Sequence, residues 1–392
     1  LPSPWEKGAE VAVDAEGEPV EVPCTDEAPL AAYVFKTIAD PFVGKLSYVK
    51  VISGKLAADS APINSRTGQP ERLGKIIYIR GKKQEDTAYI TAGDIGAVTK
   101  LAATETGDAL CDPKKVLSFD PIHFPHPCLT MAIKAEAKGD EAKIASALQR
   151  LMEEDPTLAY ENNAETHQQL ISGLGEQHLD VLVSKLKNKF GVSVSLEVPR
   201  VAYRETIRKD VKSRGFFKRQ SGGRGQYGDC WLELIPQEQG KGYEFENKVV
   251  GGAIPKEYIG SVEAGVKEAM ETGVLAGFPM VDIKVVVYDG SYHEVDSSEM
   301  AFHIAGSLAF KDAMQKAAPV LLEPIMKVEV TTPEDYMGDV IGDINSRRGR
   351  IEGMEDIGGG KMIRGYVPLS EMFGYATDLR SRTQGRGNYS MF

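Results

Sequence analysis

The sequence of 392 residues is long enough for two to four domains, and its 42% hydrophobic and 26% charged residues are ordinary for a globular protein. It has no run near the roughly 18 apolar residues of a membrane span, its opening LPSPWEKG lacks the pattern of a signal peptide, and its net charge of -11 argues against a simple basic protein that coats nucleic acid. Four dispersed cysteines without a C-x-x-C pair favour a reducing, cytoplasmic location over a disulfide or zinc framework.

The first third of the chain predicts an arm followed by a small β-barrel. Residues 1–27 are acidic and rich in Pro and Gly, which is typical of a linker or an extended arm. The first residue is not Met, so we expect the chain to be cut from something longer. Residues 28–120 contain short β-rich runs broken by glycine, such as LGKIIYIRG and TAYITAGDIGAVTKL. Many short strands at close spacing indicate a barrel.

Two later regions, residues 121–198 and 323–392, have the same order of elements. In the first, helices over Asp140 to Glu154 and about Glu176 to Phe190 alternate with strands such as LTMAIKAEA and VSVSLEV. The second runs from the strand MKVEVTTP through a helix, a hairpin and another helix to the strand GNYSMF. This β-α-β-β-α-β order predicts two ferredoxin-like domains in a multidomain α+β protein, with residues 199–322 between them.

The middle region carries a basic segment that ends in the glycine-rich sequence SGGRGQYG, residues 221–228. From Arg204 to Gly228 there are eight basic residues and only two acidic ones. Such a run is often no more than a solvated face, but flexible glycines with Arg224 and Tyr227 at the apex favour contact with phosphate and base. Strand periodicity breaks again at GSYHEVD. The two loops could meet at one end of the domain, although the sequence alone does not show that they do.

The spacing G-x-G-x-x-G at Gly223, Gly225 and Gly228 does not predict a nucleotide site. A dinucleotide loop must open a helix, whereas DCWLELIP reads as a strand, and the other kinase motifs do not follow. None of the six Gly-Lys pairs precedes Ser or Thr as a P-loop requires, and no Asn-Lys-x-Asp guanine reader occurs. We therefore expect no cofactor and no GTPase activity in this chain alone.

Two clusters of reactive residue types also predict no chemistry. The stretch HFPHPC, residues 123–128, is a proline-rich connector without a second group of ligands, so we expect no metal there. His293, Asp296 and Ser298 are the residue types of a hydrolase triad, but nothing in the sequence supplies an oriented relay or an oxyanion hole. We expect no catalytic residues, and His293 is equally consistent with a plain exposed loop position.

Long motifs in one order give the chain a close resemblance to elongation factor G, the ribosomal translocase family, without its GTP-binding domain. They are LPSP, ADPFVGKL, AGDIGAV, LMEEDPTL, GLGEQHLD, VAYRETI, QSGGRGQYG, YDGSYHEVDSSEMAF, LLEPIMKVEV, GDVIGDINSRRG and VPLSEMFGYATDLRS. The resemblance implies a β-barrel domain II (28–120), a ferredoxin-like domain III (121–198), an elongated α/β domain IV of ribosomal-protein-S5-like type (199–322), and a ferredoxin-like domain V (323–392) whose C-terminal end we expect to be truncated.

The resemblance also implies a function, namely binding of the ribosome by a monomeric cytoplasmic factor that promotes GTP-dependent translocation of tRNA and mRNA. GTP and Mg²⁺ would bind only in the missing domain, the partners would be ribosomal RNA and proteins with tRNA and mRNA in the decoding site, and no membrane is implied. In that family the glycine loop and the SYHEVD loop form the tip of domain IV. The implied tip contacts are Lys218, Arg219, Gly222, Gly223, Arg224, Gly225, Gln226, Tyr227, Gly228, His293, Glu294 and Asp296, and further candidates in domain V are Arg347, Arg348 and Arg350.

A contact between His293 and RNA sets a condition on its loop. The carboxylates of Glu294 and Asp296 would repel RNA if they pointed the same way as the ring. We therefore expect the loop to aim the imidazole outward and both carboxylates back.

Two positions depart from the family pattern. The family usually has Gly in place of His167 and Leu in place of Gln177, and the arm after LPSP is unusually acidic. These departures leave open a paralogue with altered GTP coupling, or a ribosome-binding protein without a GTPase domain that has a regulatory or ribosome-protection role.

Overall fold

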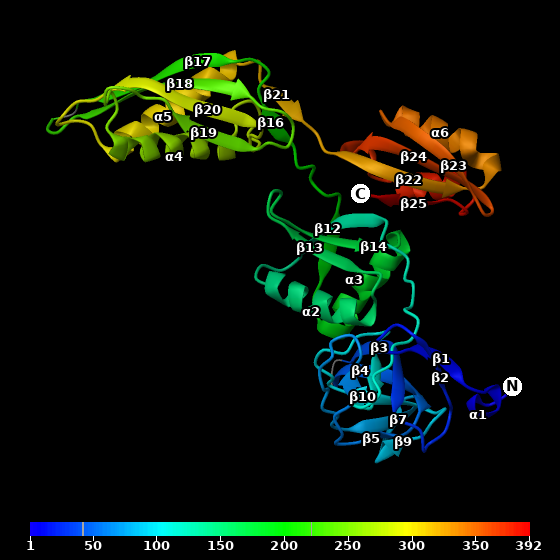
Figure 1. Ribbon diagram of the computed structural model, residues 1–392. Coiled ribbons are helices and arrows are strands. Elements are labelled where there is room, and N and C mark those ends of the chain that lie inside the picture. The colour runs from blue at the N-terminus through cyan, green and yellow to red at the C-terminus, as the bar shows by residue number, and fades with distance from the viewer. Residues whose placement is uncertain (41–42, 221) are drawn as a thin grey trace. The chain divides into compact units, whose positions relative to one another are not determined.

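The computed structural model describes residues 1–40, 43–220 and 222–392, which form two compact units, Leu1–Pro199 and Arg200–Phe392. Each unit contains two domains with separate hydrophobic cores (Figure 1). Within the described residues, no helix combines the length and the apolar character needed to cross a membrane. The multidomain α+β fold predicted from the sequence is confirmed.

Residues 1–27 fold into a short helix and a hairpin rather than the extended arm that their composition predicts. Helix α1 spans Pro4–Lys7, and strands β1 (Glu10–Val13) and β2 (Pro19–Val22) pair antiparallel. Ala12 and Val22, one from each strand, are buried against the next domain's strands, and the Trp5 indole donates to the Ala92 carbonyl at 3.0 Å. The acidic residues occupy mainly exposed positions between these apolar ones, so composition alone does not reveal the hairpin.

The next domain is built on a seven-stranded antiparallel sheet in the order β6-β11-β3-β4-β10-β7-β8. Along much of its two long strands, buried residues alternate with less buried ones, the period of two that is typical of a strand with one face on a core. In the part of the chain that the structure describes, no hydrogen bonds join β6 to β8, so closure of the predicted barrel stays a prediction. The strands are β3 Ala31–Asp40, β4 Gly44–Ser53, β5 Leu56–Ala57, β6 Ile63–Asn64, β7 Ile76–Arg80, β8 Lys83–Thr87, β9 Tyr89–Ile90, β10 Ile95–Thr99 and β11 Ala109–Cys111.

The two predicted ferredoxin-like domains are confirmed and share one topology. Their sheets run β13-β14-β12-β15 and β23-β24-β22-β25, so in each the first strand lies between the third and the fourth. The helices bury one apolar stripe each, for example Ile144, Leu148 and Leu151 of α2. The elements are β12 Leu129–Ala135, α2 Glu141–Glu154, β13 Ala159–Asn163, β14 Gln168–Gly173, α3 Glu176–Phe190 and β15 Val194–Glu197, then β22 Ile325–Thr332, α6 Met337–Ser346, β23 Arg350–Ile357, β24 Gly360–Pro368, α7 Tyr375–Arg382 and β25 Asn388–Met391.

His167 lies in the turn between β13 and β14 with φ at 52°, in the left-handed region. A side chain there costs about 1 kcal/mol relative to glycine, which has no Cβ to clash. Backbone conformation therefore accounts for the glycine that the family places at this position. The other departure, Gln177, is exposed in the first turn of α3.

The remaining domain packs two helices on one face of a four-stranded sheet in the order β17-β18-β20-β19 (Figure 1). A Cβ at Gly215 of β17 would lie 1.9 Å from the Ala305 carbonyl oxygen of α5, so glycine is required for this close approach. Strand β16 pairs with β21 at the point where the chain enters and leaves the domain. The elements are β16 Arg204–Thr206, β17 Val211–Arg219, β18 Gln226–Pro236, β19 Tyr243–Asn247, α4 Lys256–Thr272, β20 Ile283–Ser291, α5 Glu299–Lys316 and β21 Val320–Leu322.

The carboxylate of Glu205 in β16 organises the loop that follows α4. Glu205 is fully buried, and its two carboxylate oxygens accept backbone N–H groups of residues 274, 275, 276 and 278 at 2.6 to 3.1 Å. Burial alone would raise the pKa of this carboxyl, but the four N–H donors outweigh burial and hold the pKa below its ordinary value of 4.5. An acidic residue inside the basic segment therefore has a structural purpose.

We predict that Glu205→Gln destabilises this domain by about 1–3 kcal/mol, because an amide offers one acceptor oxygen where the carboxylate offers two with charge. Since the folded pKa lies below 4.5, the stabilisation is complete above about pH 4.5 and is lost as the pH falls through the folded pKa. Urea unfolding followed by the fluorescence of Trp231 in a Trp5→Phe background reports on this domain. A difference between wild type and variant that does not shrink towards low pH would contradict the prediction.

Candidate nucleic-acid interface

The structure brings together the two loops that the sequence analysis singled out. One follows β17 and leads into β18, and the other, residues 292–298, joins β20 to α5; both lie at the same end of the domain (Figure 1). The Asp296 carboxylate accepts the backbone N–H of Gly225 at 3.0 Å, and its carbonyl accepts that of Tyr227 at 2.9 Å. The Ser297 hydroxyl donates to the Tyr227 carbonyl at 2.9 Å. The loops therefore form one hydrogen-bonded tip.

Two of the predicted tip glycines are buried and pack the loops together. A Cβ at Gly228 would lie 2.3 Å from the Ala301 carbonyl oxygen, and one at Gly225 would lie 2.9 Å from the Asp296 carboxylate. These glycines allow the hairpin to approach the start of α5, so their burial does not fit the predicted RNA contact. Gly222 and Gly223 are exposed, with φ at 46° and 151°.

His293 is 54% exposed, and its ring orientation is fixed by the loop backbone. Its Nδ1 accepts the N–H groups of Val295 at 3.3 Å and Asp296 at 3.2 Å. In the neutral ring the proton is therefore on Nε2. An exposed imidazole held in this way offers an N–H donor to a partner and is no packing residue.

The two carboxylates beside His293 behave differently. Asp296 turns back towards the hairpin and is mostly buried by its contact with Gly225, as predicted. Glu294 is exposed, and the expected direction of its carboxylate stays a prediction. The exposed carboxylate lowers the positive potential on this side of the tip.

The cations of the tip are exposed, whereas Tyr227 is not at its apex. Arg224 is exposed and uses Nε to donate to the Val295 carbonyl at 2.9 Å, and Lys218 and Arg219 are exposed at the end of β17. Tyr227 and Gln226 are half-buried. The Tyr227 hydroxyl is 2.7 Å from the Ser291 hydroxyl, and its ring packs edge-on against the ring of Phe216. The Tyr227 side chain therefore lies along strand β18 and not at the apex of the tip.

The three arginines predicted in domain V have different environments. Arg347 is only 12% exposed; it pairs with Asp343 and Asp378 and donates to the Glu371 carbonyl at 2.6 Å, so it stabilises the domain itself. Arg348 is exposed, but the carboxylates of Glu323 and then Glu371 raise its pKa and neutralise its charge. Arg350 is exposed at the start of β23. It is the candidate of this group that best fits an external contact.

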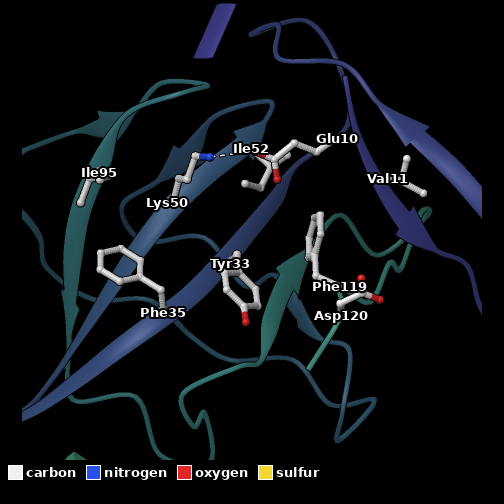
Figure 2. A pocket seen from close by; sticks show the side chains of 9 residues that line it. All are labelled: Glu10, Val11, Tyr33, Phe35, Lys50, Ile52, Ile95, Phe119 and Asp120. Atoms are coloured by element: carbon white, nitrogen blue, oxygen red, sulfur yellow. Dashed lines mark hydrogen bonds and ion pairs between the residues drawn. The ribbon is translucent and has the colours of Figure 1, made fainter. Parts of the chain in front are cut away.

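The domain built on the seven-stranded sheet has a pocket that the sequence did not predict. It has a volume of about 530 Å³ and is lined by the rings of Tyr33, Phe35 and Phe119 (Figure 2). The Lys50 ammonium donates to the Glu10 carboxylate at 2.8 Å across one side, so these two charges neutralise each other. The lining comes from the hairpin, from strands β3, β4 and β10, and from the segment after β11, and no local motif marks such a combination.

Comparison with known proteins assigns the same family to all four domains. Four family models match successive parts of the chain. They are elongation factor G domain 2 over residues 29–113, domain III over 124–198, domain IV over 199–318 and the C-terminus over 320–392. A solved chain from Thermus thermophilus is 38% identical, with a TM-score of 0.76. The alignment covers 100% of the present chain and 56% of that one. The chain belongs to the elongation factor G family, of which it contains domains II, III and IV and the C-terminal domain.

Proposed function

We propose that the chain is the ribosome-binding part of an elongation factor that promotes GTP-dependent translocation of tRNA and mRNA. The observation that carries the proposal is the joined tip, in which Asp296 holds two loops together while Arg224 and His293 stay exposed. A tip that is fixed before binding loses little conformational entropy when it enters a narrow RNA site. Membership of the family supports the ribosome as the partner.

Each exposed group has a distinct part in this proposal. Arg224, Arg219 and Lys218 supply positive charge for phosphates, which gives affinity without reading sequence. The Nε2 donor of His293 binds a phosphate or a ribose oxygen and needs no change of protonation to do so. The tip therefore binds tRNA and mRNA through their backbones and does not read their sequence.

GTP and Mg²⁺ enter this proposal only through a domain outside the chain. The sequence contains neither a P-loop nor a guanine-reading motif. GTP hydrolysis in that domain would then act on the position of domain IV, which does not bind the nucleotide itself.

We predict that GTP gives no binding heat with this chain in isothermal titration calorimetry at micromolar protein. The physical reason is that no Gly-Lys pair is followed by the hydroxyl that a P-loop needs for Mg²⁺. A saturable signal in the micromolar range would show a nucleotide site that the sequence motifs miss.

The double change Arg219→Glu with Arg224→Glu should weaken ribosome binding and reduce its salt dependence. Each lost phosphate contact lowers the slope of log K against log salt by about 0.7 to 0.9, so two contacts lower it by about 1.4 to 1.8. Co-sedimentation with ribosomes at several salt concentrations measures this slope. The control Lys114→Glu with Lys138→Glu changes the net charge equally at exposed positions of the other unit. If the two double variants have equal slopes of log K against log salt, the basic run makes no specific phosphate contact and is only a solvated face.

We predict that His293→Ala, in a factor that joins this chain to its GTP-binding domain, slows translocation about tenfold, the effect of losing one hydrogen bond to a charged group. Ribosome-stimulated GTP hydrolysis should stay near normal, because the hydrolysing site lies elsewhere. His293→Gln keeps a neutral N–H donor and should recover part of the rate. An unchanged translocation rate in the alanine variant would show that translocation does not depend on the His293 side chain, and would contradict the proposed contact with RNA.

A further inference from the structure

The sheet of domain IV has a second face that the helices do not cover. Gly215 points at α5, so the residues that alternate with it along β17 point to the opposite face. On this open face Arg214 lies opposite Trp231 of β18, and Lys218 lies opposite Tyr227. The sequence of β17, VKSRGFFKR, contains four basic residues and no acidic one. We call this uncovered face of the sheet the open face; its side chains include Lys212, Arg214, Phe216, Lys218, Trp231 and Tyr288.

Aromatic rings and cations alternate across the open face. The Arg214 guanidinium carbon is 4.7 Å from the ring centre of Phe216 and 5.8 Å from that of Trp231. The Lys212 ammonium is 5.1 Å from the ring centre of Tyr288, and the Trp231 and Tyr288 rings are 6.5 Å apart. Isolated exposed rings are common on protein surfaces, but a row of rings with interleaved cations is a specific arrangement.

The centre of the row is fixed by a buried acid. Both oxygens of Asp229 accept from Arg214, at 2.7 and 3.0 Å, and the Ser291 hydroxyl donates to the same carboxylate at 2.6 Å. Asp229 is only 4% exposed, whereas the side chain of Arg214 is 44% and Phe216 is 45% exposed. The guanidinium plane is therefore held in place with solvent access, and the acid beneath it is shielded from a ligand.

We infer that the open face binds single-stranded RNA, with bases stacked on Phe216 and Trp231. Phosphates are held by Lys218 and by Lys212, which exchanges its ion pair with Glu233 at 3.7 Å for the phosphate. Unpaired bases stack on aromatic rings and on arginine planes, whereas the bases of a duplex are not accessible to rings on a sheet. The basic β17 edge matches a polyanion, and the interleaved charges would be costly to bury in a dry contact with protein. The inference deepens the proposed function, on which it rests for RNA as the partner, by adding a surface separate from the tip.

The test uses Trp231 as the probe. The chain has two tryptophans, so Trp5→Phe leaves Trp231 as the reporter. Titration with a single-stranded uridine dodecamer should quench its fluorescence in a saturable, salt-sensitive way, and an RNA duplex of equal length should not. Phe216→Ala should weaken binding about 5- to 100-fold, the effect of losing one stacked base, and Phe216→Tyr should restore it.

Matched controls separate stacking from general surface effects. Tyr89→Ala removes a ring that is 50% exposed and lies 5.4 Å from the Lys55 ammonium, but in another domain. It should leave the quenching unchanged. Phe216 is on the surface, so its variant should keep the wild-type circular dichroism. No quenching by single-stranded RNA, or equal loss in the Tyr89 and Phe216 variants, overturns the inference.

Ribosome co-sedimentation distinguishes failure of this inference from failure of the proposed function. Ribosome binding that depends on Arg219 and Arg224, together with no quenching by RNA, would overturn the open face as an RNA site and leave the proposed function standing. Quenching by RNA in a chain that does not bind ribosomes would overturn the proposed function and leave the open face standing as an RNA site. Weaker ribosome binding by Phe216→Ala without any effect of free RNA would point to a protein partner and overturn the RNA assignment.

Discussion

The hydrogen bonds that Asp296 accepts from Gly225 and Tyr227 are the constraint on which the tip depends. Its carboxylate binds the backbone of Gly225, which lies 71 residues away in the sequence, and its carbonyl binds the backbone of Tyr227. In the same turn the backbone N–H of Asp296 donates to the Nδ1 of His293, as does that of Val295, so the residue that joins the loops also helps to orient the ring. A surface made by two separate mobile loops would have to be ordered during binding, at a cost in free energy that this arrangement avoids.

The tip inherits its rigidity from the helix that begins beside it. The Ser298 side chain caps α5 by accepting the N–H of Ala301, and α5 then contributes Phe302 and Phe310 to the core of domain IV. Gly228 and Gly215 allow the hairpin to lie directly on this helix. Displacement of the tip relative to the core would require these close contacts to open.

Most of the fold could be predicted from the local spacing of apolar residues. The features that could not be predicted depend on contacts between residues far apart in the sequence. The two ferredoxin-like domains were predictable because each helix and strand shows its own apolar spacing. The burial of Gly225, and the different surroundings of Arg347 and Arg350, depend on partners far along the chain. Three nearby arginines look alike in a sequence, but one lies between Asp343 and Asp378 and another faces solvent. Exposure, which decides whether a cation can meet RNA, is a tertiary property.

Charge distribution is what makes the proposed binding of RNA compatible with an acidic chain. With a net charge of -11 the whole molecule is repelled by RNA at distances within the screening length, so binding must use a local reversal of sign. Domain IV provides it by burying one acid within its basic segment and one next to it: Glu205 is fully enclosed by backbone N–H groups, and Asp229 lies beneath Arg214. The cations that remain exposed run along β17 towards Arg224. The acidic remainder of the chain then disfavours other orientations, so repulsion contributes to the selection of the face that meets RNA.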